Sequence, residues 1–294
     1  MLLITGATGN LGKTTIDFLL NKIAPNQIAA LVRDIDKAKD LIAAGVETRT
    51  GDYYEPTSLV SALKDINTLL LISTNATENR LEQHRHVIDA AKINKVKHIV
   101  YTSMLKASEN SIFEPAVDHF YTEEYIKETG IPYTILRNSF YAEIIPLLMG
   151  DALQTGNWYY PAANTKVNFV SRKDIAEALS IVLISPATFA NQTYEIASGT
   201  SYSFAEIAGM ASIIKGRTVT YMPIPLQAMK EGMKQAGLPE PLISLIASGA
   251  EAIAAGEVDI TDNSLEVLLK RKPTDLKACL PELLTEVNEH LPGN

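Results

Sequence analysis

Short apolar segments alternate with segments of helical spacing through the first half of the chain. The apolar runs lie at 2–5, 28–32, 46–50, 68–72, 98–102 and 133–136, and helical spacing is found between them at 11–20, 35–44, 57–63, 81–93 and 116–129. Strands that read as continuous apolar runs are buried on both faces, which indicates a parallel sheet with helices on each side. The alternation therefore predicts βαβ units with right-handed crossovers, in a doubly wound Rossmann-type α/β fold.

This rhythm changes after about Arg137, where glycines, prolines and the aromatic run Trp158-Tyr159-Tyr160 indicate an irregular region. Ser171 with Asp174 resembles a capping box and predicts a helix to about residue 184, followed by a short strand at 193–197 that rejoins the main sheet. Ser203 with Glu206 is a second capping box, ahead of an apolar helix to residue 214.

Residues 225–257 are rich in Ala, Met and Leu and are expected to be helical, above the sheet. We therefore divide the chain into a Rossmann domain at 1–150, which 167–200 rejoins, and a smaller α-rich lobe that covers the substrate, at 151–166 and 201–294.

Composition excludes several classes of protein. The 294 residues include 26 Lys and Arg against 34 Asp and Glu, a net charge of −8, which argues against a nucleic-acid binder. Cys279 is the only cysteine, so an internal disulfide and a cysteine-cluster metal site are ruled out, and the few scattered histidines give no metal prediction. No apolar run approaches the roughly 20 residues that span a membrane, and the N-terminus lacks a basic leader. A cytoplasmic protein is expected.

A glycine-rich turn follows the first predicted strand. Its sequence, Gly6-Ala7-Thr8-Gly9-Asn10-Leu11-Gly12, has the spacing G-x-x-G-x-x-G and opens the first helix. Gly6 allows a tight turn, Gly9 lets the backbone approach a pyrophosphate, and Gly12 permits close packing of helix and strand. The helix N-terminus offers unpaired N–H groups to the phosphates. The context favours an NAD(P)-binding site, formed by Gly6, Thr8, Gly9, Asn10, Leu11 and Gly12, over a surface turn with three glycines.

The end of the second predicted strand bears on the choice between NADP and NAD. Arg33 lies where a Rossmann fold meets the adenosine ribose, and Lys37 follows four residues later. An arginine at this place suits a 2′-phosphate, whereas an acid accepts hydrogen bonds from a 2′-hydroxyl. Asp34 is the competing acid, and solvated roles for Arg33 and Lys37 are the alternative. We favour NADP(H), with NAD(H) as the second choice.

Later strand ends supply the other candidate cofactor residues. Asp52 and Tyr53 follow the third strand and are expected to line the adenine. Ser73, Thr74 and Asn75 follow the fourth strand and are expected under the ribose and nicotinamide, and Thr102 and Ser103, at the end of the fifth, are assigned to the same site.

Asn138 ends the sixth strand, at the edge where open α/β sheets bind ligands, and is a candidate to orient the nicotinamide carboxamide. Phe140, Tyr141 and Trp158 are candidates for an aromatic face that holds a flat substrate. A place in the core between the two domains is the alternative for these aromatic residues.

The glycine turn, Arg33, Gly51-Asp52-Tyr53 and Thr102-Ser103 resemble the NmrA-like branch of atypical short-chain dehydrogenase/reductases. The resemblance covers nearly the whole chain and extends through the segments 83–92, 96–103, 131–138 and 237–241. It is strongest to the NADPH-dependent members that reduce quinones and triphenylmethane dyes. The family includes both reductases and non-catalytic cofactor sensors.

The wider superfamily carries a Tyr-x-x-x-Lys catalytic pair, and this chain departs from it. The resemblance aligns Pro115 with the tyrosine and His119 with the lysine, and no shifted copy of the motif is present. It therefore implies direct hydride transfer to an electrophilic acceptor that needs little acid–base help. His119 is the candidate to donate a proton or hold the cofactor ribose, against the alternative of a histidine packed at a helix start.

Three functions follow from these residues. The first is an NADPH-dependent reductase of quinones or similar planar electrophiles, the second a non-catalytic NADP(H)-sensing interaction protein, and the third a nucleotide-sugar epimerase. The missing acid–base pair disfavours the epimerase. No nucleic acid, membrane or metal is expected as a partner, and a homodimer stays open.

Overall fold

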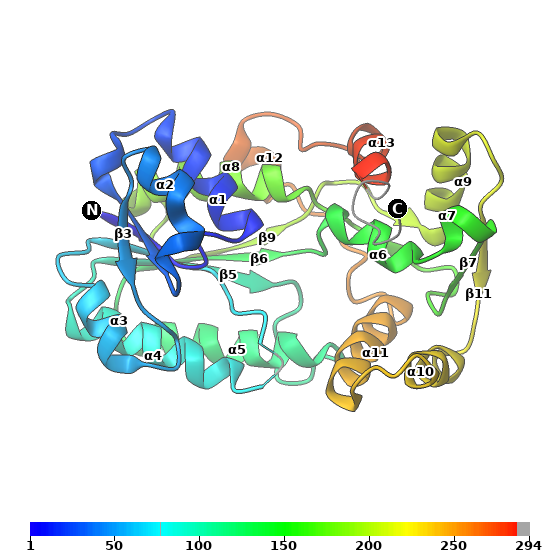
Figure 1. Cartoon of the computed structure of the whole chain (residues 1–294), viewed down its shortest axis with the longest axis horizontal. Helices are drawn as coiled ribbons and strands as arrows, with labels where there is room; N and C mark the ends of the chain where they lie inside the picture. Colours follow the sequence, from blue (N-terminus) through cyan, green and yellow to red (C-terminus); the bar gives the residue numbers. More distant parts are fainter. Residues whose placement is uncertain (77, 287–294) are drawn as a thin grey trace.

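The computed structural model describes residues 1–76 and 78–286, and its centre is a parallel sheet (Figure 1). The strand order is β3-β2-β1-β4-β5-β6-β9, and every neighbouring pair is parallel. The strands are β1 (Leu2–Ile4), β2 (Ile28–Val32), β3 (Glu47–Thr50), β4 (Thr68–Leu71), β5 (His98–Met104), β6 (Tyr133–Asn138) and β9 (Gln192–Ile196). The chain order reverses beside β1, so a crevice is expected at its carboxyl end.

Helices cover both faces of this sheet, as Figure 1 shows. One face packs against α1 (Asn10–Leu20), α2 (Lys39–Ala43), α8 (Arg172–Ile184) and α12 (Ser264–Leu269). The other packs against α3 (Pro56–Ala62), α4 (Arg80–Ile93) and α5 (Glu114–Glu128). Residues of β2 and β4 are buried throughout because both of their faces are covered, which confirms the predicted doubly wound Rossmann-type fold.

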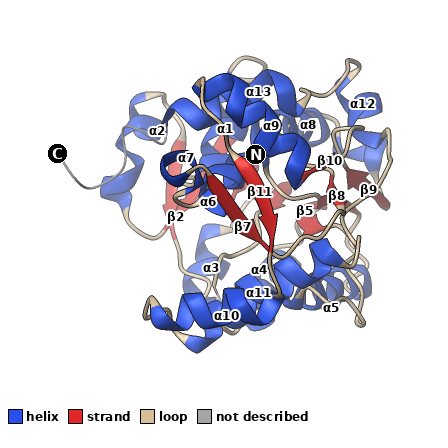
Figure 2. Cartoon of the chain, turned by 90° about the vertical axis from the view of Figure 1, so that its right-hand side faces the viewer, coloured by secondary structure: helices blue, strands red, loops and turns tan. Residues whose placement is uncertain are grey.

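The second lobe has its own hydrophobic core around Trp158, Phe169 and Phe204. It contains α6 (Ile145–Met149), α7 (Ala152–Thr155), α9 (Phe204–Lys215), α10 (Leu226–Gln235), α11 (Glu240–Ala254) and α13 (Leu276–Glu286). Two small sheets complete it, one of β7 (Asn157–Tyr160) with β11 (Thr220–Pro223) and one of β8 (Lys166–Val167) with β10 (Tyr202–Ser203). Figure 2 shows β7 and β11 side by side among the helices of this lobe.

Several local predictions are confirmed. The strand expected at 193–197 is β9, at the edge of the main sheet. Ser203 and Glu206 form the predicted capping box at the start of α9. The region 225–257 is helical as expected and is divided into α10 and α11, because the chain turns at Gly237 and Pro239.

Asp174 has a different role from the one its spacing predicts. Ser171 caps α8 through the backbone N–H of Lys173, whereas the buried carboxylate of Asp174 accepts hydrogen bonds from Arg271 Nη2 at 2.7 Å and the Thr274 backbone N–H at 2.5 Å. These contacts tie the segment after α12 to the Rossmann domain. Residues 264–269, which are expected in the lobe from the sequence, form α12 and pack against α8 and β9 of the Rossmann domain. No helix of the described residues is long and apolar enough to cross a membrane.

Candidate functional site

The glycine turn joins β1 to α1 at the carboxyl edge of the sheet. Gly6 has a φ of +59°, which a side chain would strain. A Cβ on Gly12 would lie 2.3 Å from the Gly6 carbonyl oxygen, so the helix approaches the turn as closely as only glycine allows. Gly9 is the N-cap of α1 and offers no side chain to its N–H groups, and the first turn holds no acid. The helix N-terminus is therefore open to an anionic ligand.

A cavity of about 580 Å³ extends along this edge in both directions from the turn. The predicted residues on its wall are Gly6, Thr8, Gly9, Asn10, Leu11, Gly12, Arg33, Asp52, Tyr53, Ser73, Thr74, Asn75 and Tyr141. The predicted residues that do not line it are Lys37, Thr102, Ser103, His119, Asn138, Phe140 and Trp158. Arg80, Gln83 and Arg172 line it without having been predicted.

Arg33 and Asp34, which follow β2 at one end of the cavity, make different contacts. The Asp34 carboxylate accepts the Asp36 backbone N–H at 3.0 Å and caps the 3-10 helix Ile35–Ala38, which takes the place of the first turn of the predicted helix. Asp34 does not line the cavity, whereas Arg33 does, and among the described residues the Arg33 guanidinium makes no hydrogen bond or ion pair. Lys37 is exposed on the same 3-10 helix, outside the cavity wall.

Tyr53 lies under the same end and is fixed by a hydrogen bond from its hydroxyl to the Ile72 carbonyl oxygen at 3.0 Å. Burial raises the pKa of this phenol well above its ordinary value, so Tyr53 is neutral and acts as a flat wall.

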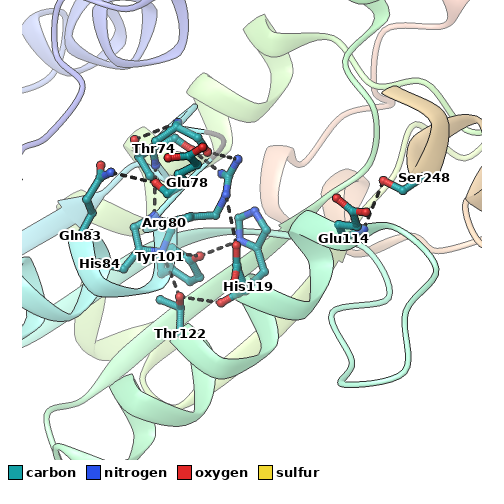
Figure 3. Close-up of polar contacts among 12 residues, drawn as sticks. Thr74, Glu78, Arg80, Gln83, His84, Tyr101, Glu114, His119, Thr122 and Ser248 are labelled. Atoms are coloured by element: carbon teal, nitrogen blue, oxygen red, sulfur yellow. Dashed lines mark hydrogen bonds and ion pairs between the residues drawn. The ribbon is translucent and has the colours of Figure 1, made fainter. Parts of the chain in front are cut away.

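The loop after β4 carries Ser73, Thr74 and Asn75 and is held from below. Thr102 Oγ1 accepts the Ser73 backbone N–H at 2.9 Å, and His84 Nε2 accepts the Thr74 backbone N–H at 3.1 Å. Arg80 donates to the carbonyl oxygens of Thr74 and Ala76 (Figure 3). Thr102 therefore positions cavity residues and does not line the cavity itself.

Ser103 belongs to a buried charged cluster. Its hydroxyl donates to Glu123 Oε1 at 2.5 Å, and Arg137 binds the same carboxylate through Nε at 2.8 Å and Nη2 at 2.6 Å. Arg137 also binds Glu195 of β9 at 3.1 Å. Glu123 is fully buried, so its charge has to be paired inside the protein. The cluster links α5, β5, β6 and β9.

His119 lies on the buried side of α5, beneath the loop. Its Nδ1 is 2.6 Å from the Tyr101 hydroxyl, and Figure 3 shows the two rings beside His84 and Thr122. Burial holds the pKa of His119 well below its ordinary value, and burial lowers the pKa of His84 to about 3. Both rings are therefore neutral. Since His84 Nε2 accepts a hydrogen bond, the proton of this ring is on Nδ1, which donates to Thr122 Oγ1.

Asn138, Ser139 and Tyr141, at and just after the end of β6, differ in their surroundings. The side-chain amide of Asn138 and the hydroxyl of Ser139 are buried without a hydrogen-bond partner among the described residues. Tyr141 lines the cavity under the guanidinium of Arg172, 5.3 Å from its ring centre. Burial raises the pKa of Tyr141, and the charge of Arg172 opposes this effect.

Phe140 packs on Phe113 at 5.5 Å between ring centres, next to Gly249 of α11, where the two domains meet. Trp158 is 1% exposed, donates to the Leu148 carbonyl oxygen at 2.7 Å and packs at a tilted angle against Phe204 in the lobe core. The structure thus brings Tyr141 to the cavity and leaves Trp158 away from it.

Within the part of the chain that the structure describes, no three His, Cys, Asp or Glu side chains are placed to hold a metal ion.

Comparison with known proteins agrees with this geometry. The model of the NmrA-like family matches residues 1–280. Quinone oxidoreductase 2 of Escherichia coli (strain K12) is 34% identical over 288 residues, which are 98% of this chain and all of that protein. The crystal structure of an NADPH-dependent quinone oxidoreductase from Escherichia coli complexed with NADPH has a TM-score of 0.92, with 34% identity over 97% of this chain and 100% of that one.

The Citrobacter sp. triphenylmethane reductase complexed with NADP(H) has a TM-score of 0.89, with 36% identity over 96% of this chain and 100% of that one. A family match over this length, together with identities above 30% across whole chains, confirms the resemblance seen in the sequence. The chain belongs to the NmrA-like family.

Proposed function

We propose that the protein is an NADPH-dependent reductase that passes hydride directly to quinones or similar planar electrophiles. One observation carries the proposal: an open helix N-terminus, the loop after β4 and Arg33, which has no hydrogen-bond or ion-pair partner among the described residues, line one continuous cavity. Similarity over the whole chain to NADPH-dependent quinone and dye reductases supports the same activity.

The residues present fit a nicotinamide dinucleotide phosphate. The glycine turn and the N–H groups of α1 would hold the pyrophosphate, and Arg33 would bind the 2′-phosphate. Asp52 and Tyr53 would line the adenine, and Ser73 to Asn75 the nicotinamide ribose. Asn138, which ends β6 and lies just outside the cavity wall, is the candidate to orient the carboxamide, because its buried amide has no hydrogen-bond partner among the described residues. When bound, the reduced nicotinamide supplies the hydride.

The protein's part in the reaction is binding, orientation and exclusion of water. No Tyr/Lys pair is needed, since a quinone that accepts a hydride becomes a hydroquinone anion, which takes its proton from water. His119 is buried against Tyr101 and does not line the cavity, so we assign it a positioning role through the Tyr101 hydroxyl. The paired His84 then holds the loop under the nicotinamide.

The test is anaerobic oxidation of NADPH, followed at 340 nm, with a panel of benzoquinones, naphthoquinones and triarylmethane dyes. We expect one reduced acceptor for each NADPH consumed. No oxidation above background with the whole panel would refute the proposal.

One observation favours the alternative of a cofactor-sensing protein: no histidine of the described residues lines the cavity. A sensor would bind NADPH tightly, reduce no member of the panel and bind a protein partner with an affinity that differs between NADPH and NADP⁺.

A further inference from the structure

Arg172 is the first residue of α8, and its side chain forms part of the cavity wall. Its guanidinium carbon lies 5.3 Å from the centre of the Tyr141 ring, so the cation rests on an aromatic face. The backbone N–H of Arg172 donates to Glu143 Oε1 at 2.9 Å, whereas the guanidinium makes no hydrogen bond or ion pair with any described residue. An arginine side chain has five N–H donors, which here are available to a ligand in the cavity.

The place of Arg172 in the site follows from the path of the chain. The lobe segment returns to the end of β6 just before α8, where the Val170 N–H donates to the Phe140 carbonyl oxygen and the Ala142 N–H to the Val170 carbonyl oxygen, both at 2.9 Å. From this edge α8 runs along α1 on the same face of the sheet (Figure 1). Arg172 therefore lies at the carboxyl edge of the sheet, as the glycine turn does.

The strand order gives the side of the turn on which Arg172 lies. β6 is on the β4 side of β1, whereas β2 and β3, which carry the residues expected at the adenosine, are on the other side. In a Rossmann fold the two halves of a dinucleotide lie on opposite sides of the first strand. Arg172 and Tyr141 are therefore on the nicotinamide side of the glycine turn.

The charges on the cavity wall leave one cation for this position. The pyrophosphate bridge of a dinucleotide carries a negative charge on each phosphate, whereas a helix N-terminus supplies only about half a positive charge. The basic residues on the wall are Arg33, Arg80 and Arg172. Arg33 is at the adenosine end, and Arg80 donates to two carbonyl oxygens of the loop after β4 and lies 3.7 Å from Asp118. Arg172 thus remains to pair with the second phosphate.

We infer that Arg172 binds the nicotinamide-side phosphate of the dinucleotide, together with the N-terminus of α1, and that Tyr141 and Glu143 position its guanidinium. The inference rests on the proposed use of NADPH and adds a second phosphate contact to the same site. It gives Tyr141 a role different from the flat substrate face that the sequence suggests.

Glu143 and Tyr141 have distinct parts in this arrangement. The Glu143 carboxylate accepts the N–H at the start of α8 through Oε1 at 2.9 Å and Oε2 at 3.3 Å. This end of α8 is therefore occupied by a carboxylate, and the contact with a phosphate is left to the Arg172 side chain. The Tyr141 ring supports the guanidinium from one side, which limits the rotamers that the arginine has to give up when it binds a ligand.

The inference is tested by titration of Arg172→Gln with NADPH, NADH and 2′,5′-ADP. The last ligand carries the 2′-phosphate and the adenosine-side phosphate but lacks the nicotinamide-side phosphate. We expect the Kd of NADPH and of NADH to rise about tenfold, because hydrogen bonds between charged groups are among the stronger ones, and that of 2′,5′-ADP to change less than about twofold. An arginine that binds the 2′-phosphate would give the opposite pattern, with a loss for 2′,5′-ADP and none for NADH.

The matched control is Lys173→Gln, which removes the charge of the next, exposed residue and should leave all three Kd values within about twofold. Arg172→Lys keeps the charge without the forked geometry and should recover only part of the lost affinity.

The role of Tyr141 is tested by a pair of variants. Tyr141→Phe keeps the aromatic face and should leave the Kd of NADPH within about twofold, whereas Tyr141→Leu removes the face and should raise it about threefold. The loss in Tyr141→Leu should again be confined to NADPH and NADH, a pattern that a general loss of structure would not produce. Urea unfolding verifies that each variant is folded.

Equal weakening of NADPH and 2′,5′-ADP by Arg172→Gln, or unchanged Kd values for both dinucleotides, would overturn the inference. Equal losses in Tyr141→Phe and Tyr141→Leu would refute the positioning role of the ring. These titrations contain no acceptor, so a protein that binds NADPH but reduces no quinone would refute the proposed reductase activity, and the Kd values would still decide the role of Arg172.

Discussion

Replacement of Arg33 by glutamine tests the assignment of the adenosine end. The variant Arg33→Gln removes the charge and keeps a polar side chain that can still donate a hydrogen bond. A hydrogen bond to a charged group contributes about 1.5–3 kcal/mol, and the exposure of Arg33 places it at the lower end of that range. We therefore expect the Kd of NADPH to rise about tenfold, at 1.4 kcal/mol for each factor of ten. The Kd of NADH should change less than about twofold, because NADH lacks the phosphate.

Isothermal titration with NADPH, NADH and 2′,5′-ADP provides the assay. The adenosine fragment should lose the same factor as NADPH, because it carries the phosphate but not the nicotinamide. Lys37→Gln is the matched control, since Lys37 is an exposed cation outside the cavity, and it should leave all three values within about twofold. Arg33→Asp should weaken NADPH further. Equal losses for NADPH and NADH in either Arg33 variant would show that this side chain does not meet the 2′-phosphate.

Three further predictions concern packing, buried charge and pH. Gly12→Ala should lower the free energy of unfolding by about 1–3 kcal/mol and weaken NADPH binding, whereas Gly232→Ala, whose Cβ meets open space, should not destabilise; urea titration compares them. Glu123→Gln should lower the free energy of unfolding by about 3–5 kcal/mol, and the exposed Glu124→Gln by at most about 0.5 kcal/mol. Equal losses of stability for the two variants in calorimetry would contradict the role given to the buried cluster. Because His84 is neutral in the fold with a pKa of about 3, the unfolded chain alone takes up its proton as pH falls below 6.5; wild type should therefore lose about 2 kcal/mol more stability than His84→Gln between pH 7.5 and pH 5 in urea unfolding.

The fold was predictable because its signal is local and repeated. Each buried parallel strand has to be apolar along its whole length, and each is followed by a helix with one apolar face. The glycine turn was predictable for a related reason, since Gly12 is required by a contact only six residues away, with the Gly6 carbonyl group. Sequence reasoning therefore succeeded where cause and effect lie within one βα unit.

The sequence was less informative where the partner of a residue is distant in the chain, or where the role of a residue depends on whether its side chain is buried. Nothing near His119 in the sequence reveals that its ring is buried against Tyr101 and stays neutral. Nothing near Trp158 reveals that its side chain is buried in the core of the lobe. Arg80 and Arg172 were missed because they open helices, not end strands. The sequence did offer an indication for Arg172: it is the first residue of the helix predicted from the cap residue Ser171, so it lies at a helix N-terminus.

The exchange of segments between the two domains has a consequence for biosynthesis. The apolar face of α1 is covered by α8, which in turn packs against α12. During synthesis α1 therefore waits for α8, which lies in the second half of the described chain, before its hydrophobic side is sheltered from water. Domains built from contacts between residues far apart in the sequence fold slowly, and until they fold they expose hydrophobic surface that promotes aggregation. We expect a nascent fragment that stops before α8 to need chaperone protection.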